Sequence, residues 1–294
     1  MILDRIKKGE TLVGDGAMGT MLFQRGLQQG ECPEALNLSK PELLAEIASL
    51  YVRAGADIVQ TNTFGASPMK LAEYGLAEKT EAINSQAVTA TKKAVAGRAY
   101  VSGSCGPSGQ ILKPYGEAAP DDLYRGFERQ MRALIAAGVD VVCVETMTDL
   151  REAILAIKAA KSVSTSIPVI ATMTFDATPR GFYTIMGTNV KEAAAGLQAA
   201  GADIVGSNCS NGLEKMIEIA REFKQVSASP LIIQSNAGLP ENRNGVLVYP
   251  ESPEFFAEKT RELVKLGVSI IGGCCGTNPD TIRAIRKTLD TQKH

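Results

Sequence analysis

Histidine and tryptophan are almost missing from this sequence of 294 residues, which has no tryptophan and a single histidine, His294, at the last position. A terminal residue is a poor place for a catalytic base or a metal ligand, because chain ends are seldom held in place. The sequence therefore argues against Ser-His-Asp and Cys-His catalysis and against metal sites built from histidine.

The sequence also lacks an excess of charge of either sign. Its 31 basic and 32 acidic residues give a net charge of −1 and form no long runs. Proteins that bind nucleic acid or anionic membranes usually carry a basic patch, and none is evident here. No segment approaches the roughly 18 apolar residues of a membrane span, and residues 1–10 contain no apolar signal core. We therefore expect a cytoplasmic protein that binds small molecules or other proteins, with no nucleic acid and no membrane among its partners.

Eight short apolar segments alternate with amphipathic segments of helical length along the whole chain. They span residues 11–15, 57–63, 99–105, 139–145, 168–174, 203–209, 231–236 and 268–274. Strands that are apolar throughout, without alternation, are typical of parallel sheets covered on both faces. Eight such units predict an α/β fold of the TIM-barrel type, a single-domain (β/α)₈ barrel that covers residues 1–294.

Local signals mark the predicted ends and beginnings of several helices. A weak repeat reads AGADIV at 54–59 and 200–205, AGVDVV at 137–142 and LGVSII at 266–271. Each copy is predicted to end a helix at its glycine and to enter a strand. Helices are predicted to begin after Ser39, which has capping-box spacing to Glu42, and after Ser252 and Asn278, which precede prolines.

Polar residues and cysteines gather at the carboxyl ends of the predicted strands, where TIM barrels hold their active sites. They are Asp15, Gly16, Asn62, Thr63, Cys105, Gly106, Glu145, Thr174, Cys209, Asn236, Cys274 and Cys275. A barrel with a purely structural role would not need them there. We therefore expect the functional site at this end of the barrel.

Three cysteines at two of these strand ends predict a metal site. Cys209 ends the sixth strand and the Cys274-Cys275 pair ends the eighth, so the fold can bring the three thiols together. Three soft protein ligands with one open position are typical of catalytic zinc. Neighbouring glycines are expected to allow the tight backbone path of adjacent ligands: Gly272, Gly273 and Gly276.

The charge of such a site predicts its chemistry. Zn²⁺ with three thiolates has a formal charge of −1, which suits neither the polarisation of a carbonyl nor the formation of hydroxide. It suits an incoming thiol, because coordination deprotonates the thiol and leaves a sulfur that can attack an activated methyl group. No general base is then needed, in agreement with the scarcity of histidine.

Other candidate residues leave alternatives open. Cys32, Cys105 and Cys143 are better read as buried apolar residues than as ligands, although Cys105 is a rival ligand by position. Glu145 fits a solvated loop acid as well as a site residue. The turn DGAMGT, from Asp15 to Thr20, fits a plain β/α turn as well as a set of backbone N–H groups that bind an anion such as a carboxylate.

Seven motifs together resemble the homocysteine S-methyltransferase family, especially the homocysteine-binding barrel of its cobalamin-dependent methionine synthase branch. They are DGAMGT (15–20), ECPEALN (31–37), GADIVQTNTF (55–64), ETMTD (145–149), NCS (208–210), NAGLP (236–240) and GGCCGT (272–277). The resemblance covers essentially the whole chain. The combination of NC with GGCCGT is its most specific part.

This resemblance implies a role for each group of site residues. Zinc would be held by Cys209, Cys274 and Cys275, with the sulfur of homocysteine as fourth ligand and Asn236 in that position before substrate arrives. Glu145 would bind the amino group of homocysteine. The turn would form the amino-acid binding loop, through Asp15, Gly16, Ala17, Gly19 and Thr20.

The segment GPSGQILKPYG (106–116) resembles the cobalamin-linked branch and bears on the methyl donor. We expect methylcobalamin or another corrinoid, carried by a partner protein or domain, to methylate homocysteine in methionine biosynthesis. One alternative is a sulfonium or betaine donor (S-methylmethionine, S-adenosylmethionine or betaine), for which aromatic rings would form a cage: Phe64, Tyr115, Phe182 and Tyr249. A second alternative is a zinc-binding subunit without catalysis.

Overall fold

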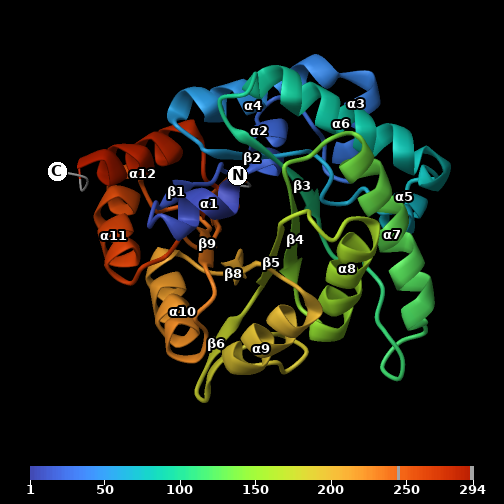
Figure 1. The fold of residues 1–294 in the computed structure, drawn as a ribbon. Helices are drawn as coiled ribbons and strands as arrows, with labels where there is room; N and C mark the ends of the chain where they lie inside the picture. The colour runs from blue at the N-terminus through green and yellow to red at the C-terminus, as the bar shows by residue number, and fades with distance from the viewer. Residues whose placement is uncertain (244–245, 292–294) are drawn as a thin grey trace.

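The chain forms a closed barrel of parallel strands surrounded by helices (Figure 1). The computed structural model describes residues 1–243 and 246–291. The eight strands of the sheet follow the order β1-β12-β9-β8-β5-β4-β3-β2. A parallel bridge between Gly14 and Ile58 joins the two ends, where the Asp57 N–H donates to the Val13 carbonyl at 2.8 Å. The predicted (β/α)₈ barrel is therefore confirmed.

Seven of the eight barrel strands lie within the apolar segments that the sequence singles out, and β4 begins within its segment. The strands are β1 (Leu12–Val13), β2 (Ile58–Gln60), β3 (Tyr100–Cys105), β4 (Val141–Met147), β5 (Val169–Met173), β8 (Ile204–Asn208), β9 (Leu231–Ser235) and β12 (Ile270–Gly273). Two antiparallel hairpins lie outside the barrel, formed by β6 (Asp176–Thr178) with β7 (Gly181–Tyr183) and by β10 (Glu241–Arg243) with β11 (Val246–Val248). β4 extends two residues beyond its predicted segment, through Met147.

Helices connect the strands and form the outer layer. They are α1 (Ile2–Lys7), α2 (Met18–Phe23), α3 (Leu36–Ser39), α4 (Pro41–Ala54), α5 (Pro68–Ala72), α6 (Thr80–Val95), α7 (Pro120–Ala136), α8 (Leu150–Val163), α9 (Val190–Ala200), α10 (Leu213–Val226), α11 (Pro253–Lys265) and α12 (Pro279–Thr291), with 3₁₀ turns at Pro33–Ala35 and Ala77–Lys79. Within the described residues, no helix is long and apolar enough to cross a membrane.

The repeated motif marks the passage from a helix into a strand, as predicted. Its glycines, Gly55, Gly138, Gly201 and Gly267, have φ values of 99°, 90°, 107° and 72°. This left-handed conformation strains residues with a Cβ atom but not glycine, which explains why glycine recurs at the helix end.

Two of the three predicted helix starts are confirmed. The Ser252 hydroxyl accepts from the Phe255 N–H at 3.3 Å, and Asn278 Oδ1 accepts from the backbone N–H groups of Asp280 and Thr281 at 2.9 and 3.1 Å. The predicted cap at Ser39 is wrong. Ser39 is itself helical, since it ends α3, and its hydroxyl donates back to the Ala35 carbonyl at 3.2 Å, so that α4 begins only at Pro41.

The hydrophobic core has two layers. Apolar side chains from the strands fill the barrel interior toward its amino end, where Ile2 of α1 packs among them: Leu12, Ile58, Val141, Cys143, Ile170, Ile204, Ile232 and Ile270. A larger cluster lies between the strands and the surrounding helices. The apolar filling of the amino end leaves the carboxyl end as the part of the interior that holds polar groups.

Candidate active site

The structure brings the three predicted ligand cysteines together at the carboxyl end of the barrel. The Sγ atoms of Cys209, Cys274 and Cys275 all lie within 4.8 Å of one another, and those of Cys209 and Cys275 are 3.9 Å apart. Four ligands around a zinc ion, with Zn–S bonds of about 2.3 Å, place neighbouring sulfurs roughly 3.8 Å apart. The separation of the thiols fits a metal of this kind after only small side-chain movements.

Backbone hydrogen bonds fix the two segments that carry the cysteines to β9, which lies between them. The Cys209 N–H donates to the Gln234 carbonyl at 3.2 Å, and the Cys274 N–H donates to the Ser235 carbonyl at 2.7 Å. Cys209 has a φ of 63°, in the left-handed region. The chain therefore turns sharply at the end of β8, and the Cys209 thiol faces the Cys274-Cys275 pair.

Hydrogen bonds among the thiols separate their pKa values. Bonds from the other two thiols lower the pKa of Cys209, whose sulfur is the acceptor. The hydrogen bond to Cys209 raises the pKa of Cys274 and that of Cys275, with burial as a further cause. Cys209 is therefore the thiol whose ionisation its neighbours favour most, and a bound cation would favour the ionisation of all three.

Asn236 provides a further group that fits a metal. Its side chain forms a hydrogen bond with Cys209, which contributes to the lowered pKa of that thiol. Its Oδ1 atom is buried and has no hydrogen-bond partner among the described residues. A buried polar oxygen without a partner is costly unless it meets a ligand, water or ion. These two observations agree with the role of temporary fourth ligand that the family resemblance implies for Asn236, which stays a prediction.

A cavity of about 250 Å³ opens beside the cysteines. It is lined by Gly16, Ala17, Met18, Gly19, Thr20, Pro33, Glu34, Gln60, Thr61, Asn62, Phe64, Ser104, Glu145, Thr146, Cys209, Gly273, Cys274 and Cys275. Of the predicted substrate-binding residues, Asp15 and Asn236 lie outside this lining. The others share the cavity with the three thiols, and its volume suits a small amino acid rather than a macromolecule.

The turn that follows β1 lines the cavity from Gly16 to Thr20, and its Ala17 N–H donates to Thr277 Oγ1 at 3.2 Å. Its helix, α2, begins after Ala17 without a side-chain cap, so the first helical turn has no internal partner for its N–H groups. A Cβ atom on Gly16 would lie 2.7 Å from Thr277 Oγ1 and 3.0 Å from the Tyr51 ring. Gly16 is therefore required by close packing, in addition to any contact with a ligand.

Asp15 and Glu145 are buried carboxyl groups at this end of the barrel. Burial raises the pKa of Asp15 to about 8, although a hydrogen bond from the Gln60 backbone N–H lowers it. Burial likewise raises the pKa of Glu145 to about 7, against hydrogen bonds from Ser104 and the Gln60 side chain. Among the described residues, no lysine or arginine forms an ion pair with either group. Glu145 lines the cavity, which favours the site residue over the loop acid.

The remaining cysteines lie apart from the cluster. The Cys105 thiol is fully buried and donates to Gln130 Oε1 at 3.3 Å, so it is not a ligand to the same metal as Cys209. Cys143 belongs to the apolar interior, and Cys32 is buried and contacts Glu34 at 3.5 Å. For these three, burial as small apolar side chains is the better interpretation.

The expected role of the glycines in GGCCGT needs a correction. Only Gly276 has a left-handed conformation, with a φ of 80°. Gly272 and Gly273 lie within or at the end of β12, and their importance is steric: a Cβ atom would come within 3.1 Å of Gly14 Cα and 2.2 Å of Thr277 Oγ1, respectively. Close packing of strands, rather than a tight turn, requires glycine at these two positions.

The sequence interpretation missed several residues that line the cavity or support it. Glu34 reaches the cavity from the loop between α2 and α3 and accepts from the Gly65 N–H at 2.7 Å. Gln60 and Ser104 lie on β2 and β3 beside Glu145. Glu34 stands in the quoted motif ECPEALN, which was the one available signal for it. For Gln60 and Ser104, the available signal was the alternation of inward and outward side chains along β2 and β3.

Glu251 supports the cysteine site from outside the cavity. Its carboxylate accepts from the Leu213 N–H, at 3.0 Å to Oε2, and so caps α10, the helix that follows Cys209. Its backbone N–H donates to the Ala237 carbonyl at 2.9 Å, and the Ala237 N–H donates to the Cys275 carbonyl at 2.9 Å. Glu251 thus connects the segments that carry the two groups of cysteines.

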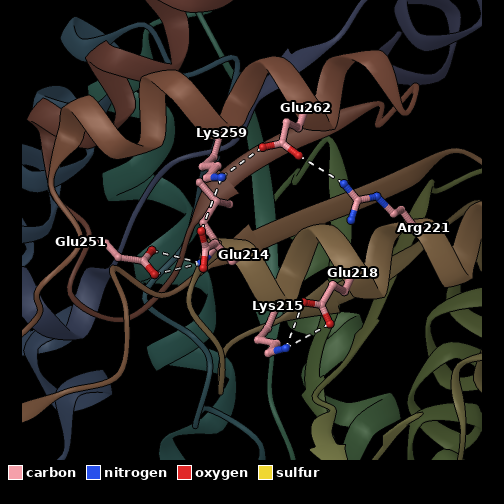
Figure 2. Close-up of polar contacts among 8 residues, drawn as sticks. Glu214, Lys215, Glu218, Arg221, Glu251, Lys259 and Glu262 are labelled. Atoms are coloured by element: carbon pink, nitrogen blue, oxygen red, sulfur yellow. Dashed lines mark hydrogen bonds and ion pairs between the residues drawn. The ribbon is translucent and has the colours of Figure 1, made fainter.

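Figure 2 shows Glu251 directed at the start of α10, apart from a row of surface ion pairs between α10 and α11. In that row Lys259 lies 3.2 Å from Glu262, which lies 3.2 Å from Arg221. Surface pairs of this kind contribute little to stability. The contact made by Glu251 differs because its carboxylate accepts from the Leu213 N–H, which the helix itself cannot satisfy.

The comparison with known sequences identifies the family. The chain matches the sequence model of the homocysteine S-methyltransferase family over residues 12–289. Methionine synthases from Mycobacterium leprae and Mycobacterium tuberculosis are each 33% identical to it over 93% of the chain. The chain spans 24%, about a quarter, of the length of each of these relatives. The chain belongs to the homocysteine S-methyltransferase family, and the expected class of enzyme, a methyltransferase, is confirmed at the level of the family.

The comparison with solved structures supports the fold. The metallated form of the Escherichia coli homocysteine methyltransferase MmuM has a TM-score of 0.79 and 24% identity, over 96% of this chain and 97% of that one. Its oxidised form has a TM-score of 0.80 and 24% identity, over 98% and 99% of the two chains. At this level of identity the likeness establishes the shared barrel and no more.

Proposed function

We propose that this chain catalyses zinc-dependent transfer of a methyl group to the thiol of homocysteine, giving methionine, with a methylated corrinoid on another protein or domain as donor. The observation that carries the proposal is the placement of three thiols on the wall of one small cavity that also exposes Glu145 and the turn after β1. Family membership supports the acceptor. The multidomain size of the methionine synthase relatives supports a separate donor module.

In this proposal Cys209, Cys274 and Cys275 hold the zinc, and Asn236 fills the fourth position until substrate arrives. A zinc ion held in this way would lower the pKa of a substrate thiol, so that the sulfur is ionised at neutral pH. The residues fit this role because they are soft ligands in close contact and because Asn236 Oδ1 is buried without a partner. A general base is not required.

The other cavity residues orient the amino acid. The carboxylate of Glu145 binds the ammonium group of homocysteine. Because no lysine or arginine among the described residues forms an ion pair with Glu145, the substrate supplies the positive charge. The backbone N–H groups at the start of α2 bind the substrate carboxylate. These two contacts, from opposite ends of the amino-acid group, fix the direction in which its thiol points. Asp15 supports the turn through its bond to the Gln60 N–H, 2.8 Å long, rather than by lining the cavity.

X-ray absorption at the zinc edge tests the acceptor. Homocysteine is expected to raise the number of sulfur neighbours from three to four and to displace one oxygen or nitrogen neighbour. A metal shell that homocysteine leaves unchanged would support a zinc-binding subunit without catalysis instead.

Methionine formation with four separate donors tests the donor. Methylcobalamin is expected to support turnover, whereas S-methylmethionine, S-adenosylmethionine and betaine are not. Turnover with one of these cations and none with methylcobalamin would reassign the donor and leave the thiol chemistry intact. A cytoplasmic location is part of the proposal, since a reducing compartment would keep the six free cysteines of the structure reduced.

A further inference from the structure

β4 is irregular at the position of Glu145. The pairing of β4 with β5 shifts register between Val144 and Met147, and Thr146 has a φ of 59°. A β-branched residue in the left-handed region is strained and persists only where its surroundings hold it. Such bulges occur beside active sites, where they redirect a side chain. Here the bulge accompanies the placement of Glu145 in the cavity.

The side chain that holds this bulge is Asn208, at the end of β8. Its Oδ1 atom accepts from the Thr146 N–H at 2.8 Å, and its Nδ2 atom donates to Thr146 Oγ1 at 2.7 Å. The Thr172 hydroxyl also donates to Oδ1, at 2.7 Å. Asn208 is fully buried, so these hydrogen bonds do not compete with water. Both polar groups of the strained residue are therefore held by one amide.

The same amide lies between the carboxylate and the sulfur cluster. Asn208 Nδ2 is 3.5 Å from Glu145 Oε2 and 3.9 Å from Cys274 Sγ. Asn208 is also bonded in sequence to Cys209, whose sharp turn begins there. Asn208 thus contacts Glu145, the predicted binder of the amino group, and Cys274, a predicted metal ligand. It also adjoins the backbone of Cys209.

We propose that Asn208 is a positioning residue, which holds the β4 bulge and thereby sets Glu145 and the thiol of Cys274 in one fixed arrangement. The inference rests on the proposed function for the meaning of that arrangement. Asparagine suits the role because its amide accepts and donates at once. Aspartate has the same shape but cannot donate, and its charge would lie against Glu145 and the thiols.

Two variants and one double variant separate this role from a general contribution to stability. N208A removes both contacts with Thr146. In N208A/T146G, glycine at 146 adopts the left-handed conformation without strain, so the bulge no longer needs support. N208D keeps the shape and loses the donor, which covers the case in which N208A does not fold. Asn84→Ala is the matched control, since Asn84 is equally buried and donates to the Ala66 and Thr80 carbonyls at 2.9 and 2.8 Å. Among the described residues, Asn84 forms no hydrogen bond with Thr146, Glu145 or the three cysteines.

The first measurement is Co²⁺ affinity without homocysteine, from chelator competition and the thiolate absorption bands. N208A and N208D are expected to bind Co²⁺ roughly 10- to 100-fold more weakly, as is usual when a residue that orients a ligand is lost. The double variant is expected to bind Co²⁺ as weakly as N208A, because the contact with Cys274 is still missing. N84A is expected to bind as tightly as the unaltered protein.

The second measurement is the KM for homocysteine with metal in excess. N208A is expected to raise this KM by about 10-fold or more. The double variant is expected to return the KM most of the way to that of the unaltered protein. The proposal is wrong if N208A resembles N84A in Co²⁺ binding, or if the KM for homocysteine is as high in N208A/T146G as in N208A. If the unaltered protein does not use homocysteine, the proposed function fails, while the Co²⁺ measurement still decides the role of Asn208.

Discussion

Asp57 and Asp15 connect the same two strands, β1 and β2, at opposite ends of the barrel. At the amino end, Asp57 Oδ2 accepts from the Val13 N–H at 2.9 Å. At the carboxyl end, Asp15 Oδ2 accepts from the Gln60 N–H at 2.8 Å. The two carboxyl groups make the same kind of bond across the same pair of strands. Their surroundings differ, and the difference separates the structural end of the barrel from the functional one.

The amino end supplies cations for two of its acids, Asp57 and Asp203. Asp57 lies 3.0 Å from Arg5 of α1 and 3.3 Å from Arg286 of α12. Asp203, which lies within the third copy of the helix-ending motif, accepts from the Val169 N–H at 2.8 Å and lies 2.8 Å from Lys161. The protein therefore satisfies these charges itself, and they contribute to stability without a ligand.

At the carboxyl end, Asp15 and Glu145 have no lysine or arginine partner among the described residues. Asp15 and Glu145 have raised pKa values because burial disfavours their charged forms. Unpaired acids of this kind are common at functional sites, where a ligand supplies the missing charge. The comparison teaches that Asp57 and Asp203 are paired within the protein at one end, whereas Asp15 and Glu145 at the other end are not, which agrees with the proposed binding of substrate there.

The largest expected effect comes from removing a thiol at the carboxyl end. Cys209→Ala should reduce zinc affinity by more than about 100-fold, because the loss of a ligand should exceed the 10- to 100-fold cost of losing a residue that only orients one. Chelator competition with the purified protein measures this. Cys105→Ala is the control, since that thiol is buried against Gln130, and it should leave zinc affinity unchanged. Equal losses in the two variants would contradict the assignment of the cluster.

The next effect concerns the dependence of stability on pH. The folded protein raises the pKa of Asp15 to about 8 from 3.8, so between these values the folded state holds a proton that the unfolded chain has lost. Stability should therefore fall as pH rises through this window, by about 1.4 kcal/mol per pH unit for one proton. Asp15→Asn keeps an acceptor for the Gln60 N–H and removes this proton.

Urea unfolding at pH 5 and pH 7, with chelator and reductant present, tests this prediction. Relative to the unaltered protein, the Asp15→Asn variant should gain about 2.7 kcal/mol between the two pH values, since the thiols and Glu145 titrate in both proteins. Unfolding free energies that change in parallel would show that Asp15 is already ionised in the folded state at pH 5.

A smaller effect is expected at the paired end. Asp57→Asn keeps an oxygen for the Val13 N–H but removes the charge that Arg5 and Arg286 share, so it should lower the free energy of unfolding by about 2 kcal/mol at pH 7. Zinc affinity should not change. Asp280→Asn, which breaks an exposed pair with Arg283, should cost less than about 0.5 kcal/mol. A loss of zinc affinity in Asp57→Asn would mean that the two ends are coupled.

The barrel and the cysteine cluster could be predicted because each depends on a regular rule. Apolar segments at even spacing predict parallel strands, and glycine at the helix ends marks where each strand begins, as at Gly55 and Gly201. Carboxyl ends of parallel strands meet at one end of a barrel, so Cys209 and Cys274 were expected to meet although 65 positions separate them.

The missed features depend on contacts between segments that no local pattern records. Thr146 breaks a local rule, since nothing in its own segment favours a left-handed threonine, and only Asn208 from another strand explains it. Gly273 is required by Thr277, which packs against it after the chain has turned. Glu34 enters the cavity from a loop whose path follows from its bond to Gly65.

The smallest expected effect concerns Glu251. This acid lies at the carboxyl end but outside the cavity, and its carboxylate accepts from the Leu213 N–H. Glu251→Gln keeps an oxygen for the Leu213 N–H and removes a negative charge from the start of α10, which should cost about 0.5–1 kcal/mol in unfolding free energy. Glu218→Gln is the matched control, because Glu218 pairs with Lys215 on the exposed side of the same helix. If the cap also holds the Cys209 segment, Glu251→Gln should weaken zinc binding by a few-fold, whereas Glu218→Gln should not. Zinc affinity is measured by chelator competition. Equal affinity in the two variants would show that Glu251 stabilises α10 without affecting the cysteine site, as is expected of the acids at the amino end.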